Sequence, residues 1–169
     1  MRKTVRKWFW VWEFDKEERW LNEMAAQGLA LVSVGFCRYD FEECAPGAYQ
    51  VRLELLENQP SHAESQKYIG FIEETGAEQV GRFMRWVYFR KKTADGPFDL
   101  YSDLASRIKH LKRIIALILP ISLANLCIGL GISWSVSLIN LALGILGCFG
   151  AWKLTQKRKR LEAEAQIFE

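Results

Sequence analysis

The chain has 169 residues and a formal net charge of +3, with 23 Lys and Arg against 20 Asp and Glu. The basic excess lies beside one long apolar stretch rather than on the preceding domain, which argues against direct nucleic-acid binding and favours an anionic lipid surface. The four cysteines lack the spacing of metal or redox sites, so we expect free thiols, no metal and no cofactor at Cys37, Cys44, Cys127 and Cys148.

Residues 1–93 are expected to form one cytoplasmic α+β domain that begins with a strand at residues 5–14. In that strand Trp8, Trp10 and Trp12 share one face, and Phe9 and Val11 share the other. A strand that is apolar on both faces belongs in the middle of a sheet.

A helix is predicted next, from an N-cap at Asp15, with Glu18 three positions on, to about residue 27. Gly28 provides the left-handed stop. The residues expected on its buried face are Trp20, Leu21, Met24 and Ala25.

The rest of the domain repeats this order of elements. Strands are predicted at residues 29–41, 49–56 and 78–91. A helix precedes the last strand, from a capping box at Ser61 and Glu64 to a stop at Gly76. The resulting β-α-β-β-α-β order predicts a ferredoxin-like domain with both helices on one face of an antiparallel sheet. The aromatic face opposite would be covered by a partner, a second copy or the following segment.

Residues 94–113 are predicted to form an amphipathic juxtamembrane helix. Tyr101, Leu104, Ile108 and Leu111 recur at helical spacing, with polar residues between them. Such a helix either lies in the membrane interface or continues into the first span.

The stretch from Ile114 to Trp152 contains no Asp, Glu, Lys, Arg or His. Because about 20 apolar residues cross a bilayer, we expect two transmembrane helices, at about residues 114–132 and 134–152, joined near Ser133. Trp134 and Trp152 would lie in opposite interfaces. A buried hairpin in a soluble protein is the alternative, and it would show a polar stripe on each helix.

The flanking charges predict the orientation in the cell membrane. Basic residues precede the first span and follow the second, whereas the connecting turn has no charge. Because basic residues stay on the cytoplasmic side, we expect both termini in the cytoplasm, including a basic and then acidic tail at residues 153–169.

Polar and small residues inside the spans predict how the helices pack. Asn125 and Asn140 would lie at similar depth, where a hydrogen bond between the helices is expected. Gly144, Gly147 and Gly150 offer a small-residue face for close packing. We favour packing within the hairpin over packing in a homo-oligomer.

The sequence predicts a binding protein rather than an enzyme. The only histidines, His62 and His110, are expected at the surface, without a carboxylate or cysteine placed for acid–base or nucleophilic catalysis. Arginines beside aromatic rings could bind an anionic or planar group, although such arginines more often cover a sheet edge. The candidate ligand or partner site comprises Trp8, Trp10, Trp12, Arg82, Trp86, Tyr88 and Arg90.

Several segments resemble one known family. The most specific is Trp-Leu-Asn-Glu-Met-Ala at residues 20–25, within a match over residues 18–28. Others are Tyr39, Phe41, residues 49–52, residues 86–91, Phe98 and residues 100–102. They resemble the uncharacterised bacterial membrane proteins grouped as domain of unknown function 2812. The resemblance implies a cytoplasmic domain followed by carboxy-terminal spans, and genes that often neighbour PadR-type regulators. It brings no catalytic residues, and relatives often carry Gly-Trp where this chain has Gly76 and Ala77.

Two functions follow as hypotheses. The first is a membrane-anchored cytoplasmic sensor or regulatory module that binds a small ligand or protein through its aromatic sheet face, in the pathway of a PadR-type regulator or with another membrane protein. The second is a non-catalytic accessory or structural subunit of a larger, transport-type membrane assembly, packed through its glycine face.

Overall fold

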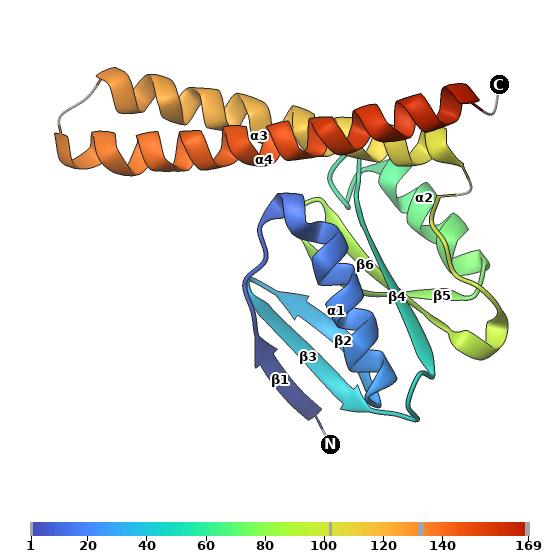
Figure 1. Ribbon diagram of the computed structural model, residues 1–169. Helices are drawn as coiled ribbons and strands as arrows, with labels where there is room; N and C mark the ends of the chain where they lie inside the picture. The colour runs from blue at the N-terminus through green and yellow to red at the C-terminus, as the bar shows by residue number, and fades with distance from the viewer. Residues whose placement is uncertain (1, 102, 132–133, 168–169) are drawn as a thin grey trace. The chain divides into compact units, whose positions relative to one another are not determined.

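The computed structural model describes residues 2–101, 103–131 and 134–167, with only the backbone described at residues 134–136 and 167. The chain divides into two compact units, Met1–Leu100 and Tyr101–Glu169. The first unit combines strands and helices, and the second is a pair of long helices (Figure 1). The predicted α+β class and the carboxy-terminal helical hairpin are therefore confirmed.

The first unit contains two three-stranded sheets, of strand order β1-β3-β2 and β4-β6-β5. In each sheet the central strand is antiparallel to both neighbours, so the outer two strands run parallel and are joined by a helix. Each sheet is thus a split β-α-β unit, which is the building block of ferredoxin-like folds. The elements in order are β1 (Arg2–Arg6), η1 (Val11–Glu13), α1 (Phe14–Ala26), β2 (Leu29–Gly35), β3 (Arg38–Glu43), β4 (Tyr49–Leu55), α2 (Ala63–Glu74), β5 (Ala77–Phe83), β6 (Trp86–Lys92) and η2 (Thr93–Asp95).

The two sheets are copies of one pattern, 48 residues apart. In the first hairpin Leu29 pairs with Glu43, and in the second Ala77 pairs with Lys91, each 48 positions later. Every later pair of the two hairpins keeps the same offset, including a register shift after Leu31 in one and after Gln79 in the other. The helix ends keep the same spacing, because α1 is followed by Gly28 and α2 by Gly76, with left-handed φ values of +83° and +88°.

Two of the predicted strands are in fact hairpins. Residues 29–41 bend at Phe36–Cys37, and residues 78–91 bend at Met84–Arg85. Cys37 and Met84 adopt left-handed φ values of 51° and 55° in these turns. Neither turn contains Gly, Asn, Asp or Pro, the residues that normally mark one, so the sequence gives no turn signal.

The predicted strand at residues 5–14 is wrong over most of its length. β1 ends at Arg6, residues 11–13 form a 3-10 turn, and α1 begins at Phe14. β1 also lies at the edge of its sheet rather than in the middle. The N-cap of α1 is Glu13, not Asp15, and it makes no side-chain cap bond. At α2, His62 rather than Ser61 is the N-cap.

The core of the first unit lies between the helices and the sheets. Strands β2, β3, β4 and β6 contribute fully buried side chains, and α1 adds Leu21. A further group gathers around α2 and includes Phe98, which is 5 % exposed. Residues 98–100 therefore pack with the first unit, although the sequence analysis placed them in the juxtamembrane segment.

The second unit is an antiparallel pair of helices, α3 (Leu104–Gly131) and α4 (Trp134–Ile167). Tyr101 lies outside α3, so the amphipathic stretch begins at Leu104 and continues directly into the predicted first span. The predicted turn residue Ser133 and the side chain of Trp134 lie outside the described residues. Both helices are long and apolar enough to cross a membrane, with mean hydropathies of 2.3 and 1.5 in their most apolar windows.

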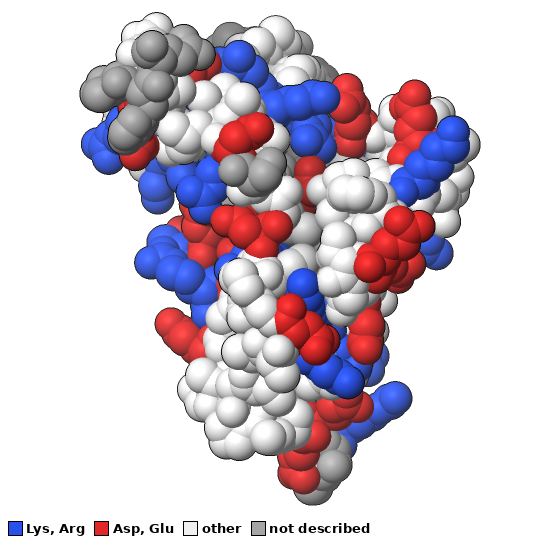
Figure 2. Space-filling model, turned by 90° about the vertical axis from the view of Figure 1, so that its right-hand side faces the viewer, with Lys and Arg blue, Asp and Glu red and all other residues white. Residues whose placement is uncertain are grey.

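Charges of both signs are interspersed over the face of the molecule shown in Figure 2. Blue Lys and Arg side chains lie next to red Asp and Glu side chains, without one broad field of a single sign in this view. Interspersed charge is typical of a solvated protein surface.

Candidate functional site

Three tryptophans and the tips of both hairpins form an exposed aromatic cluster. The Trp8 ring lies 5.3 Å from that of Trp10 and 5.9 Å from that of Phe36, and Trp10 stacks on Trp12 at 5.1 Å. Phe36 in turn lies 5.7 Å from Phe83. With Met84, the neighbour of Phe83, these residues define the hairpin-tip cluster: Trp8, Trp10, Trp12, Phe36, Phe83 and Met84.

The hairpin-tip cluster exposes large apolar side chains. Met84 is 71 %, Phe36 68 % and Trp8 54 % exposed. Arg82 is also exposed, one position before Phe83. The predicted site residues Trp8, Trp10, Trp12 and Arg82 thus belong to one region, but they meet through a loop and two hairpin turns rather than on a sheet face.

The other predicted site residues lie in the interior. Trp86 is 9 % exposed and packs on Phe14 with the ring centroids 6.0 Å apart. Tyr88 is 5 % exposed. The structure therefore does not bring these two rings together with the exposed tryptophans on one ligand-binding face.

Glu17 receives hydrogen bonds from two buried tyrosines. The Tyr39 and Tyr88 hydroxyls both donate to Glu17 Oε1 at 2.7 Å. Tyr39 belongs to the first sheet and Tyr88 to the second, so Glu17 on α1 links them. Burial raises the pKa of Glu17, against the opposing effect of the two hydroxyls. Burial and the neighbouring Glu17 also raise the pKa of both tyrosines, which stay neutral donors.

Arg90 is occupied by contacts within the protein. Its Nε donates to Glu78 at 3.0 Å, and one terminal nitrogen donates to Glu42 at 2.9 Å and to the Leu31 carbonyl at 3.0 Å. The guanidinium also lies over the Tyr49 ring at 4.7 Å. Burial lowers the pKa of Arg90, but the two carboxylates outweigh it and the net pKa is raised. Arg90 thus joins β6 to the first sheet.

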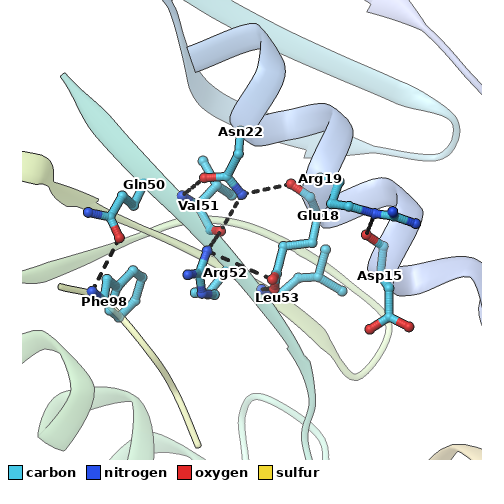
Figure 3. Close-up of polar contacts among 9 residues, drawn as sticks. All are labelled: Asp15, Glu18, Arg19, Asn22, Gln50, Val51, Arg52, Leu53 and Phe98. Atoms are coloured by element: carbon cyan, nitrogen blue, oxygen red, sulfur yellow. Dashed lines mark hydrogen bonds and ion pairs between the residues drawn. The ribbon is translucent and has the colours of Figure 1, made fainter. Parts of the chain in front are cut away.

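A polar clasp on α1 covers the free edge of β4 (Figure 3). Asn22 donates to the Val51 carbonyl at 2.9 Å and to the Glu18 carbonyl at 2.7 Å, and its Oδ1 accepts from the Val51 N–H at 2.9 Å. Glu18 accepts from the Leu53 N–H at 3.2 Å and lies 3.8 Å from Arg52. Burial raises the pKa of Glu18, while Arg52 acts to lower it. These side chains satisfy the edge as a neighbouring strand would.

The clasp was missed by reasoning from single residues. Asn22 sits in a helix that periodicity alone predicts to be amphipathic, and its partners are 29 positions away. The one available signal was the resemblance, because the most specific matching segment contains Asn22 and lies within a longer match that begins at Glu18. That segment therefore has a structural use, which is to join the two repeats.

The glycines of the second unit are used inside the hairpin. A Cβ at Gly144 would lie 2.7 Å from Leu126, and one at Gly147 would overlap Ser122. Gly129 on α3 is equally close to Leu141 at 2.7 Å. Gly150 is buried as well. Asn125 donates to the Ile121 carbonyl of its own helix at 2.8 Å.

The two histidines have different environments. His62 is exposed, and its Nδ1 accepts from the Glu64 N–H at 3.3 Å at the start of α2. His110 is 1 % exposed and packs on Tyr101 with ring centroids 5.2 Å apart, so the predicted surface position is wrong. Among the described residues, no group of three or more His, Cys, Asp or Glu is placed to hold a metal ion.

Comparisons with known proteins identify a family but no characterised relative. No curated protein and no solved structure matches the chain. One family model, described as "Protein of unknown function (DUF2812)", matches residues 13–123, which include the clasp, every strand except β1 and most of α3. Since this match covers more than half of the 169 residues, the chain belongs to the DUF2812 family.

Proposed function

We propose that the chain is a membrane-anchored sensor or regulatory module that binds a ligand or partner through the hairpin-tip cluster. The single observation that carries this proposal is the exposure of that cluster. Contiguous exposed apolar side chains rimmed by polar residues mark interaction surfaces in soluble units. Trp86 and Tyr88 are buried and Arg90 is paired with Glu42 and Glu78, so the proposed binding surface is limited to the hairpin tips and the tryptophans beside them.

The helices of the second unit support membrane anchoring. Only 22 % and 28 % of the residues in their most apolar windows are buried. The core helix of a soluble protein would instead hide most of its apolar side chains. Here the outward faces carry large exposed residues: Leu119, Ile121, Leu123, Ile128, Leu130, Leu138, Ile139, Leu143, Ile145, Phe149 and Trp152.

The proposed topology has both termini in the cytoplasm and two crossings of the cell membrane. Lys112 and Arg113 precede the uncharged stretch, Lys153 and Lys157 follow it, and the stretch itself holds no charge. An ion pair of 3.6 Å between Lys112 and Glu162 is consistent with the two cytoplasmic ends lying together. Basic flanks on the same side are the pattern of a cytoplasm-facing hairpin.

The topology is tested by labelling single cysteines with a membrane-impermeant maleimide in intact cells. Ser133→Cys is expected to react from outside, and Lys159→Cys only after the cells are opened. Reaction of Lys159→Cys in intact cells would overturn the orientation. Release of the full chain by carbonate extraction would overturn the anchoring.

The binding surface is tested by photocrosslinking in cells. A photoreactive benzoyl-phenylalanine replaces Phe36 in one variant and Phe71 in a matched control, an aromatic residue on α2 that is 62 % exposed. We expect an adduct with a protein or with lipid at position 36 and none at position 71. Equal labelling at both positions would contradict the proposal. A PadR-type regulator of the same pathway or another membrane protein is the protein partner proposed from the family resemblance.

The alternative is an accessory subunit of a larger membrane assembly. The glycines proposed for that contact already pack against Leu126 and Ser122 within the hairpin, so a second protein would have to use the outward faces instead. Phe149→Ala with Ile145→Ala on the outer face of α4 would then shift a heavier complex on native gels. An unchanged migration favours the sensor or regulatory module.

A further inference from the structure

We propose that the ligand of the hairpin-tip cluster is the surface of an anionic lipid bilayer, so that the first unit docks on the membrane that its own helices cross. This inference rests on the proposed function, since it names the ligand of the same cluster. It follows from the cluster's composition, from the charges beside it and from the length of the connection between the units.

The composition of the cluster suits the interfacial layer of a membrane. Three of its six members are tryptophans, and the most exposed members are Phe36, Met84 and Trp8. Tryptophan is enriched at the level of lipid head groups, where its ring has both apolar and polar surroundings. Phe36 and Met84 occupy two-residue turns at the ends of hairpins, a position from which side chains can enter a bilayer without carrying unpaired strand edges with them.

The charges beside the cluster match an anionic surface. Within two positions of its members lie five basic residues, namely Arg6, Lys7, Arg38, Arg82 and Arg85, and one acidic residue, Glu13. Glu13 is paired with Lys16 at 2.5 Å and Arg38 with Asp40 at 3.1 Å, so the excess of positive charge comes from Arg6, Lys7, Arg82 and Arg85. An anionic leaflet attracts each nearby Lys or Arg, so the apolar contact and the electrostatic attraction act in the same direction.

The same charges disfavour a second copy of the chain as the occupant. In a two-fold symmetric interface each residue meets the same surface on the partner. Cations that flank the cluster would then face cations across the interface, and such like-charge pairs are unfavourable. A bilayer with anionic lipid presents the opposite sign.

The connection between the units keeps the first unit close to the membrane. Only residues 101–103 separate the end of the first unit at Leu100 from the start of α3 at Leu104. Four residue steps span at most roughly 14 Å, and the uncharged part of α3 begins ten residues further on, at Ile114, which corresponds to about 15 Å of helix. The first unit as a whole is therefore held near the lipid at a high local concentration.

The test uses the full chain, one molecule per lipid nanodisc, with one spin label. The native cysteines are replaced, Cys37 and Cys44 by Ser and Cys127 and Cys148 by Ala. A label is then placed by Met84→Cys or, as the control, by Phe71→Cys on α2; both sites are exposed, at 71 % and 62 %. Collision rates with oxygen, which concentrates in the bilayer, and with a water-soluble nickel chelate report the depth of each label.

In discs with about one third phosphatidylserine, a fraction that gives an anionic surface, we expect the label at position 84 to collide several-fold less with nickel and more with oxygen than the label at position 71. Discs of phosphatidylcholine alone should reduce this difference. In the anionic discs, Arg82→Glu combined with Arg38→Glu should reduce the difference in collision rates between positions 84 and 71. Trp8→Ser combined with Phe36→Ser should also reduce this difference, without a change in charge.

Three results would overturn the inference. The first is equal nickel collision at positions 84 and 71 in anionic discs. The second is protection from nickel without a gain in oxygen collision, which indicates protein rather than lipid around the label. The third is protection only in discs that hold two chains, which indicates a second copy. Any of these leaves the proposed function standing if the crosslinker at position 36 still captures a protein; loss of that adduct as well refutes both.

Discussion

Replacement of Asn22 by Ala should destabilise the first unit more than any other single change on the polar face of α1. The substitution removes three hydrogen bonds and leaves the N–H and C=O of Val51 without their partners on α1. Val51 is 0 % exposed, so water cannot readily replace the amide. The Val51 carbonyl still accepts from the Arg52 guanidinium at 2.9 Å, so the Val51 N–H is the group left without a partner, and a buried polar group in that state costs about 1–3 kcal/mol. Domains of this size have roughly 5–15 kcal/mol in total.

Pulse proteolysis in urea, with the full chain in nanodiscs, measures this loss. At a urea dependence of about 1.5 kcal/mol per molar, a cost of about 2 kcal/mol lowers the unfolding midpoint by about 1.3 M. Arg19→Ala is the matched control on the same helix, because Arg19 makes one exposed hydrogen bond to the Asp15 carbonyl, and it should change stability by less than about 0.5 kcal/mol. A midpoint for Asn22→Ala within that margin of the wild type, or an equal loss for Arg19→Ala, would refute the assignment of the clasp.

Three further predictions use the same discs. Burial raises the pKa of Glu17 above 4.5, so protonation of Glu17 stabilises the fold fully below that pH and less as the pH rises through the folded-state pKa. When the pH is lowered from 8 to 5, the urea midpoint of the wild type should therefore rise relative to that of Glu17→Gln. Parallel pH dependences of the two midpoints would contradict this. Gly81→Ala on β5 places a Cβ 2.8 Å from Val34 on β2 and should lower the free energy of unfolding by about 1–3 kcal/mol. The control Gly35→Ala places a Cβ 3.8 Å from its nearest neighbour and should lower it by less than about 0.5 kcal/mol. Equal losses would argue against close packing of β2 on β5. Gly147→Ala should broaden the distribution of distances between spin labels on α3 and α4, because its Cβ would overlap Ser122. The control Gly131→Ala, which has open space around it, should leave the distribution unchanged. Identical distributions for the two variants would show that the hairpin does not pack through this face.

The sequence predicts most reliably where one physical requirement dominates. Gly28 and Gly76 were expected to end the helices, and both have the left-handed φ that favours glycine. The two long apolar helices follow from the uncharged stretch because few other structures tolerate such a run.

The strand predictions failed where two requirements competed. Alternating tryptophans at residues 8–12 have the period of a strand, but these rings contact one another, Trp8 edge-on to Trp10 and Trp10 stacked on Trp12, in a segment that leads into α1. The hairpin turns at Phe36 and Met84 use residues that usually avoid left-handed or tight turns. In both hairpins the pairing of the flanking strands determines the position of the turn, so the side chains of Phe36 and Met84 are not needed to form it and can serve in binding.

The candidate site could also be predicted from the sequence only in part. Aromatic and basic residues could be recognised as candidates from the sequence, but which of them face solvent depends on the hairpin turns. Trp86 and Tyr88 alternate with other apolar residues on a strand that is buried on both faces, and the alternation alone does not distinguish an exposed face from an interior one.

The clasp also explains an asymmetry between the two repeats. Counting 48 residues on from Asn22 gives Gly70, and from Glu18 gives Gln66, so α2 has lost the side chains with which α1 holds the edge of β4. The corresponding edge strand, β1, instead carries three cations among its five residues, Arg2, Lys3 and Arg6, and such charges discourage the addition of foreign strands. The free edge of β4 is thus covered by α1, whereas the free edge of β1 is protected by electrostatic repulsion between its cations and those of another chain. Neutralising the three cations of β1 would therefore be expected to make this edge a site at which chains aggregate.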